Sequence, residues 1–79
     1  GSDNNITIYT LDSCQACANL KSFLDNNNYS YIDFDASKPV NKKKLNRHDI
    51  YNVPVIVLNT EMYIGFNETE LSHRLKAYH

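Results

Sequence analysis

The sequence predicts a single α/β domain in which a four-stranded mixed sheet carries helices on both faces. Two β-prone runs, residues 5–11 and 29–37, flank one helical pattern, and strands joined through a helix pair in parallel. Two further β-prone runs lie close together near the C-terminus, which predicts an antiparallel hairpin. A chain of 79 residues has room for one small core. The predicted element order is therefore β-α-β-α-β-β-α.

The first strand–helix–strand unit is predicted from composition and spacing. The first run, NITIYTL, is rich in β-branched and aromatic residues, as expected of a buried strand. Apolar residues recur at helical spacing over residues 17–24. Residues 26–28 (NNN) should end this helix, because their side-chain amides compete for backbone hydrogen bonds. The second run alternates Ile32 and Phe34 with polar neighbours, which indicates the second strand.

A weaker helix and the hairpin follow. Residues 39–48 begin with a proline, which suits the first turn of a helix, and Val40 with Leu45 supplies a weak apolar face. Residues 53–59 (VPVIVLN) are the most β-prone run of the chain, and residues 61–66 (EMYIGF) follow after a short turn. These runs predict the two hairpin strands.

The last helix has a recognisable start. Asn67 with Glu70 three residues later is close to a capping box, with Asn in place of Ser or Thr. Leu71, Leu75 and Tyr78 then mark one apolar face. These residues predict a terminal helix that packs on the sheet.

Composition and charge limit the function classes. The net charge of −1 lacks the basic excess that is typical of a nucleic-acid-binding protein, so we expect no such partner. No run approaches the roughly 18–20 apolar residues of a membrane span, and no signal peptide is visible. Two cysteines are too few for a disulfide-rich secreted scaffold, so we expect a cytoplasmic protein. Gly1 and Ser2 have the form of a cloning remnant, which leaves residues 3–79 as one domain.

The two cysteines, Cys14 and Cys17, stand two residues apart at the predicted start of the first helix. Unpaired backbone N–H groups and the positive end of the helix dipole stabilise a thiolate at such a position. We therefore expect Cys14 to be an exposed nucleophile and Cys17 a less exposed resolving thiol. Lys21, one turn beyond Cys17, is expected to add positive potential.

Two alternatives to redox chemistry remain open for this pair. A zinc site needs about four ligands, and the chain has no second Cys-x-x-Cys. His48, His73 and His79 are available, but no two of them have the spacing of a helical ligand pair, so we expect no metal. The other alternative is a pair of inert core thiols, for which the position of Cys14 at a helix start would be unusual.

Pro54 bears on the same question. Proline is tolerated at the beginning of a strand, so a trans bond at a strand start is one interpretation. The other is a cis peptide bond after Val53, which would expose the Val53 backbone to an extended thiol substrate. Tyr51 precedes this segment and is expected to line the groove beside Cys14.

Residues 41–47 (NKKKLNR) form a local basic cluster. A solvated helix face is one interpretation of this cluster. Docking to an acidic partner or to glutathione is the alternative.

Six segments in order give the chain a resemblance to the glutaredoxin family over residues 6–75. They are ITIYT, CQAC, ANLKSFL with Lys21, YIDFD, NVPVIVL, and IGF together with ETEL. The resemblance implies the thioredoxin-like fold, a cis Pro54, and reversible reduction of disulfides or glutathione mixed disulfides. It also implies the following substrate- or glutathione-binding residues: Gln15, Lys21, Tyr51, Val53, Pro54, Gly65, Phe66 and Asn67.

The chain departs from most glutaredoxins at three places. Leu11 and Asp12 stand where many members have a basic residue before the first cysteine. Gln15 and Ala16 stand where most members have proline and an aromatic residue. The glycine turn that holds a glutathione carboxylate in the family is GFNE, in which Asn67 and the N–H groups after it remain available. A polar residue between the cysteines and the GF pair are also found in the glutaredoxin-like redoxins that thioredoxin reductase reduces and that supply ribonucleotide reductase.

Three functions follow as hypotheses. The first is a glutaredoxin-type oxidoreductase with no tightly bound cofactor and with glutathione as reductant. The second is an electron donor that thioredoxin reductase recharges. The third is a redox-inactive binding module with the same fold. For the first two hypotheses we expect a monomer that acts on a disulfide-containing protein substrate and has no membrane partner.

Overall fold

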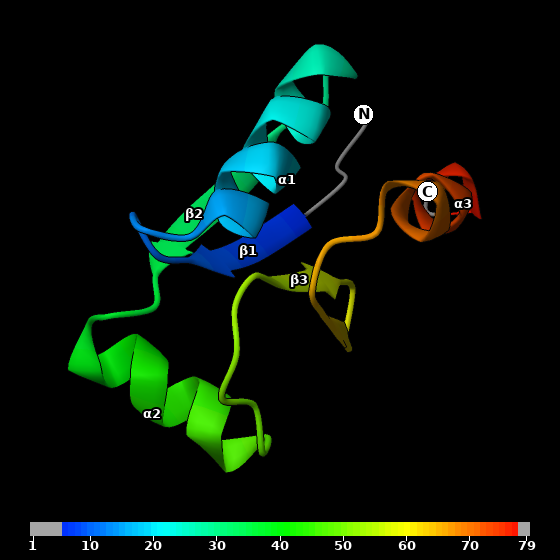
Figure 1. Cartoon of the computed structure of the whole chain (residues 1–79). Helices are drawn as coiled ribbons and strands as arrows, with labels where there is room; N and C mark the ends of the chain where they lie inside the picture. Colours follow the sequence, from blue (N-terminus) through cyan, green and yellow to red (C-terminus); the bar gives the residue numbers. More distant parts are fainter. Residues whose placement is uncertain (1–5, 78–79) are drawn as a thin grey trace.

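The computed structural model describes residues 6–77 and contains the predicted elements in the predicted order (Figure 1). The elements are β1 (Ile6–Thr10), α1 (Gln15–Asn26), β2 (Tyr31–Asp35), α2 (Pro39–Arg47), β3 (Val55–Leu58), β4 (Glu61–Ile64) and α3 (Glu68–Ala77). The expected strand residue Asn5 and the expected helix residue Tyr78 lie outside the described residues.

The strands form one sheet in the order β2-β1-β3-β4. β1 pairs in parallel with β2 and antiparallel with β3, and β3 pairs antiparallel with β4. The parallel pair and the C-terminal hairpin are therefore confirmed. The contact that joins these two units is the β1–β3 pairing, in which Tyr9 lies opposite Val55.

The helices cover both faces of the sheet, as predicted (Figure 1). One face packs against α1 and α3 through a buried cluster of Ile6, Ile8, Leu20, Leu24, Ile56, Leu58, Leu71 and Leu75. The other face packs against α2 through a smaller cluster of Tyr9, Ala36, Leu45, Ile50 and Val55. Alternate residues of β1 enter both clusters because successive side chains of a strand point to opposite faces.

Asparagines close the turns at which they were expected. The helix α1 ends with Asn27 as its C-cap, and Asn28 takes a left-handed conformation with a φ of 61°. The β3–β4 hairpin turns at Asn59, whose φ is 57°. Asn67 caps α3, since its side-chain oxygen accepts a hydrogen bond from the backbone N–H of Glu70 at 3.0 Å.

Three apolar side chains of β2 and α2 stay exposed. Ile32 is 58% exposed and Phe34 is 39% exposed, because they lie on an edge strand and α2 covers the neighbouring strands instead. Phe34 contacts the sheet by stacking on Tyr9, with 5.4 Å between ring centroids. In α2, Leu45 is buried but Val40 is 73% exposed, so Leu45 alone carries the buried side of the weak amphipathic pattern.

Within residues 6–77, no helix combines the length and the apolar character that crossing a membrane requires.

Replacing a core residue of α1 tests the packing. Leu20→Ala removes a fully buried side chain from the larger cluster, and we expect it to lower the free energy of unfolding by about 3 kcal/mol. Val40→Ala removes an exposed apolar side chain from α2 and should change that free energy by less than about 0.5 kcal/mol. Urea unfolding followed by circular dichroism measures both values, and equal losses would contradict the core assignment.

Candidate functional site

Cys14 is the N-cap residue of α1, so its sulfur lies at the open start of the helix. The backbone N–H of Cys17 donates a hydrogen bond to Cys14 Sγ at 3.1 Å. The side chain is partly exposed. A partly exposed sulfur with a backbone donor at a helix start is arranged to carry negative charge.

Cys17 lies in the first turn of α1 and is 1% exposed. The pKa of the Cys17 thiol is raised from 9.0 to about 11, mainly by burial and also by its hydrogen bond with Cys14. A hydrogen bond from the Leu11 backbone and the charge of Lys21 lower the pKa and oppose these effects. The two sulfurs, which are both free thiols here, thus have different environments.

A polar network that the sequence did not predict lies next to Cys17. Lys21 Nζ is 2.8 Å from Asp33 Oδ2 on β2, and the Thr10 hydroxyl donates to Asp33 Oδ1 at 2.6 Å. The hydrogen bond between Lys21 and Asp33 is the main reason that the pKa of Lys21 is raised. The Asp33 carboxylate therefore partly cancels the positive potential that was expected from Lys21. Sequence alternation had placed Asp33 among the polar neighbours of a strand and gave no indication of this partner.

Pro54 and Gly65 are brought together by the backbone. The Val53–Pro54 peptide bond is cis, which confirms that implication of the resemblance. The Gly65 N–H donates to the Pro54 carbonyl at 2.7 Å, and Gly65 has a φ of 88°, a conformation that favours glycine. The register of β1 and β3 has Tyr9 opposite Val55, so Pro54, which directly precedes Val55, comes near the end of the strand that leads to the cysteines.

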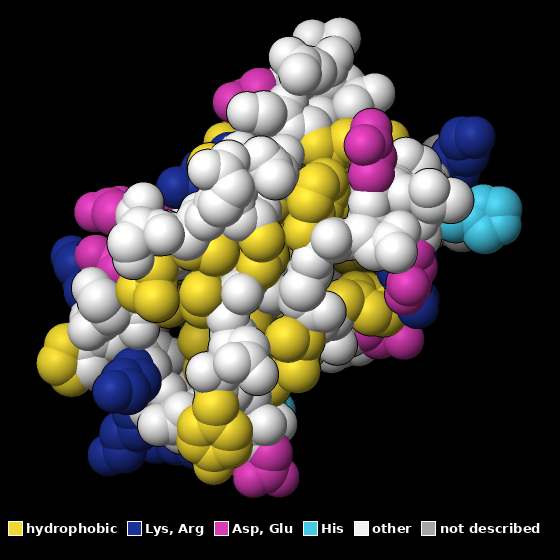
Figure 2. Space-filling model, viewed as in Figure 1, with side chains coloured by type: hydrophobic (Ala, Val, Ile, Leu, Met, Phe, Trp, Pro, Cys, Tyr) yellow, Lys and Arg dark blue, Asp and Glu magenta, His cyan; other side chains and the backbone are white. Residues whose placement is uncertain are grey.

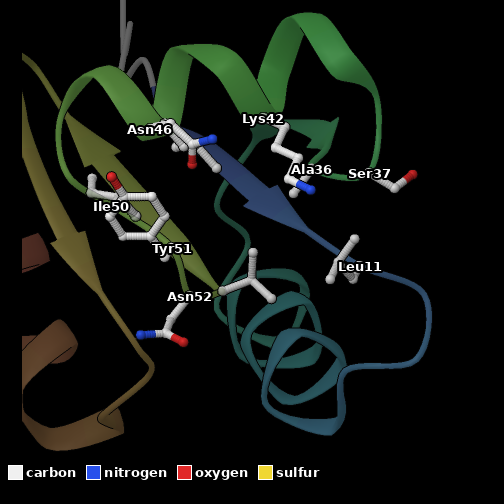
Figure 3. Close-up of a pocket in the computed structure, with 10 residues that line it drawn as sticks. Leu11, Ala36, Ser37, Lys42, Asn46, Ile50, Tyr51 and Asn52 are labelled. Atoms are coloured by element: carbon white, nitrogen blue, oxygen red, sulfur yellow. The ribbon is translucent and has the colours of Figure 1, made fainter.

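A groove of about 420 Å³ lies beside this strand end (Figure 3). Three of its walls are the segment after β1, the helix α2 and the segment before Pro54. Leu11, Tyr51 and Val53 line it, so two of the expected substrate-binding residues share one surface. Leu11 connects this surface to the cysteines, because its carbonyl accepts a hydrogen bond from the Cys14 N–H at 3.3 Å.

Other expected site residues have partners within the fold. The Gln15 side chain donates to the Asn19 side chain along α1 at 3.0 Å. Phe66 packs against Phe23 of α1, with 5.7 Å between ring centroids. The Asn67 side chain caps α3. These contacts give each residue a structural role in addition to the expected role in binding.

Two acidic side chains lie at the start of α3. Glu68 and Glu70 both stand in its first turn. Glu70 forms an ion pair with Arg74 at 2.9 Å, which leaves Glu68 as the uncompensated charge of the two. Negative charge at this position opposes the attraction of the helix N-terminus for an anion.

Among the described residues, no three His, Cys, Asp or Glu side chains are placed to hold a metal ion together.

The sequence matches the profile of the family described as Glutaredoxin over residues 6–63, which is more than half of the chain. No curated protein sequence matches the chain.

Several solved structures have the same fold. A mutant of the thioredoxin-like protein BC3987 superposes with a TM-score of 0.81 at 30% identity, covering 90% of this chain and 94% of that one. The glutaredoxin-like NrdH-redoxin from Escherichia coli superposes with a TM-score of 0.80 at 21% identity, covering 87% and 92%. A glutaredoxin from Archaeoglobus fulgidus gives a TM-score of 0.77 at 21% identity, covering 95% and 89%. At 21% identity, the last two matches are evidence for the fold alone.

The different environments of the two thiols predict selective alkylation. At pH 8, a thiol with a pKa of about 11 is ionised in on the order of one molecule in a thousand, and Cys17 is also buried. We therefore expect iodoacetamide to modify Cys14 at least about tenfold faster than Cys17, measured by mass spectrometry of the reduced protein. In Cys14→Ser, modification of Cys17 should accelerate as the pH rises above 9. Faster modification of Cys17 in the wild type at pH 8 would contradict this assignment.

The network beside Cys17 predicts changes of opposite sign. In a Cys14→Ser background, Lys21→Gln should raise the pKa of Cys17, because it removes a positive charge and leaves the Asp33 carboxylate unpaired. Asp33→Asn should lower that pKa, because the charge of Lys21 is then no longer compensated. Thiolate absorbance against pH measures both variants, with the exposed Lys76→Gln as the control. Shifts of the same sign would indicate a purely structural role.

Proposed function

This chain belongs to the glutaredoxin family, and on that premise we propose that it is a thiol–disulfide oxidoreductase that reduces protein disulfides or glutathione mixed disulfides. The observation that carries the proposal is the asymmetry of its cysteines, a partly exposed Cys14 at the start of a helix and a buried Cys17 one turn on. The two functions of a dithiol, attack and resolution, need different exposure of the sulfurs.

The reaction is two successive thiol–disulfide exchanges. Cys14, as the thiolate, attacks one sulfur of the substrate disulfide, forms a mixed disulfide and releases the other sulfur as a thiol. Cys17 then loses its proton and attacks Cys14 Sγ, which releases the second substrate thiol and leaves a Cys14–Cys17 disulfide. Two electrons and two protons pass to the substrate, and an external reductant must restore the dithiol.

The surroundings of each sulfur support these roles. The hydrogen bond from the Cys17 N–H to Cys14 Sγ favours an anionic sulfur, and partial exposure admits a substrate. The high pKa of Cys17 keeps it protonated at neutral pH, so it does not compete for the first attack. Resolution needs Cys17 as the thiolate, and Lys21 and the Leu11 backbone both favour that form.

A second candidate concerns the reductant. Gln15 between the cysteines and the Gly65–Phe66 pair are also features of the glutaredoxin-like redoxins that thioredoxin reductase reduces, and they support a protein reductase of that type over glutathione. The neighbouring E. coli NrdH-redoxin is described as a glutaredoxin-like protein with a thioredoxin-like activity profile. By this candidate, the chain is an electron donor, for example to ribonucleotide reductase.

Both candidates imply the same cellular setting. We infer a cytoplasmic monomer with no tightly bound cofactor, a disulfide-containing protein as substrate, and no nucleic-acid or membrane partner. The expected contacts of an extended substrate are with Tyr51, Val53 and Pro54.

Two coupled assays and two variants test the proposal. Turnover of a small glutathione mixed disulfide is measured with glutathione and glutathione reductase, and turnover of a protein disulfide with thioredoxin reductase and NADPH. Cys14→Ser should lower both rates by at least about a hundredfold, because it removes the attacking sulfur. Cys17→Ser should abolish protein disulfide reduction and retain a part of the glutathione-dependent rate, because glutathione can resolve the mixed disulfide.

The outcomes separate the hypotheses. Activity with thioredoxin reductase alone would exclude glutathione as the reductant and support the electron-donor candidate. Absence of activity in both assays, with no effect of Cys14→Ser on partner binding, would reject an oxidoreductase and support a binding module.

A further inference from the structure

The groove between α2 and the segment before Pro54 has a volume of about 420 Å³. Its floor and walls are largely apolar, from Leu11, Ala36, Leu45, Ile50, Tyr51 and Val53. Figure 3 shows the Tyr51 ring, the Leu11 side chain and the Lys42 side chain around one hollow, each from a different segment. Tyr51 is 72% exposed, so this wall presents an aromatic surface to solvent.

Charge is distributed unevenly around this groove. The segment 38–47, which comprises α2 and its N-cap residue, contains five of the chain's eight basic residues and no acidic residue. It therefore carries a formal charge of +5, and the remaining residues, with three basic and nine acidic, carry −6. Figure 2 shows Lys and Arg side chains gathered where Figure 1 places α2, next to an apolar surface.

These basic side chains are exposed, and within the part of the chain that the structure describes none of them forms an ion pair. Among the described residues that line the groove, Lys42 is the one with a charged side chain. Two acidic residues, Asp35 and Asp49, are sequence neighbours of residues that line the groove. The Asp35 carboxylate accepts hydrogen bonds from the backbone N–H and the hydroxyl of Ser37. A solvated helix face explains exposed lysines, but it does not explain why Lys42 borders an apolar hollow that Leu11 connects to the cysteines.

We propose that this groove docks an acidic segment of the disulfide-containing protein substrate, with one apolar side chain of that segment inside the hollow and its carboxylates facing α2. The inference rests on the proposed function and names the class of substrate that this site prefers. Leu11 lines the groove and its carbonyl accepts a hydrogen bond from the Cys14 N–H, so a docked segment would extend from Cys14. Long-range attraction to α2 would speed encounter, and the apolar side chain would set the position of the disulfide.

Glutathione fits this groove less well than a protein segment does. It has two carboxylates, which suit α2, but it has no apolar side chain for a hollow of about 420 Å³. The burial of apolar area, and not charge alone, supplies most of the affinity of such a contact.

The test uses single turnover of the reduced, full-length protein, so that no reductase is needed. Each probe is a short peptide with one cysteine in a mixed disulfide with thionitrobenzoate. Attack by Cys14 on the peptide sulfur joins protein and peptide and frees thionitrobenzoate. Attack on the other sulfur releases the peptide thiol, and thionitrobenzoate is freed when Cys17 resolves the mixed disulfide. The freed thionitrobenzoate is followed by its absorbance. One peptide has Asp, Glu and Leu beside the cysteine, a second has Lys in place of the acids, and a third has Gly in place of Leu. The glutathione mixed disulfide with thionitrobenzoate is the fourth probe.

We expect the acidic peptide with Leu to react about tenfold faster than the Lys peptide at low ionic strength, and this ratio to shrink at about 0.5 M salt. Replacing its Leu by Gly should slow the reaction severalfold at any salt concentration. Lys42→Glu should reduce the ratio of acidic to Lys peptide about fivefold. Lys76→Glu makes the same charge change at the exposed end of α3 and should leave the ratio within about twofold.

Three results would overturn the inference. The first is equal reaction of the acidic and Lys peptides. The second is an equal change of the ratio in Lys42→Glu and Lys76→Glu, which would indicate that the net charge of the protein alone sets the ratio. The third is an equal loss of reaction rate for the glutathione probe and the acidic peptide in Lys42→Glu, which would assign the groove to glutathione.

A binding measurement separates this inference from the proposed function. Fluorescence anisotropy of the acidic peptide without a cysteine, on the Cys14→Ser protein, reports docking independently of sulfur chemistry. Binding that Lys42→Glu weakens, together with no reaction of any probe, would reject the oxidoreductase and retain the docking surface. Reaction of every probe without selective binding would retain the oxidoreductase and reject the docking surface.

Discussion

The antiparallel pairing of β1 with β3 is the constraint on which the site depends. β1 supplies side chains to both buried clusters, so its position in the sheet is fixed from both faces. With Tyr9 opposite Val55, the segment that ends in Pro54 must lie beside the end of β1, from which the chain continues to the cysteines. Segments about forty residues apart in sequence thereby form one surface. The hydrogen bond from Gly65 to Pro54 then adds the turn before α3 to the same region.

A second consequence of this geometry is that one short motif holds two sulfurs of different character. Cys14 caps α1 outside the core, and Cys17, three positions on, faces the interior of the fold. The helix start supplies donors to the first sulfur, and burial keeps the second one protonated at neutral pH. Lys21 and Asp33 sit next to this pair as a partly exposed ion pair, in which one charge limits the effect of the other. The chemistry of the motif thus depends on residues from β1, β2 and α1.

Most of the fold could be predicted because its elements follow local rules. Asparagines ended α1 and turned the hairpin, Asn67 capped α3, and apolar spacing identified the buried side of α1 at Leu20 and Leu24. The errors arose where burial depends on what covers a strand or helix. Ile32 has the pattern of a buried strand residue, but it lies on an edge strand that α2 does not cover. No local pattern reports the position of a covering helix.

The sequence by itself determined the element order, the paired cysteines at a helix start and the glutaredoxin resemblance, because each depends on residues that are neighbours along the chain. Only the tertiary structure decided which distant groups meet. It paired Lys21 with Asp33, packed Phe66 against Phe23, and set the basic helix α2 beside an apolar groove next to the cysteines. The physical reason is that these contacts arise from strand register and helix placement, which the buried clusters fix jointly and which no single segment encodes.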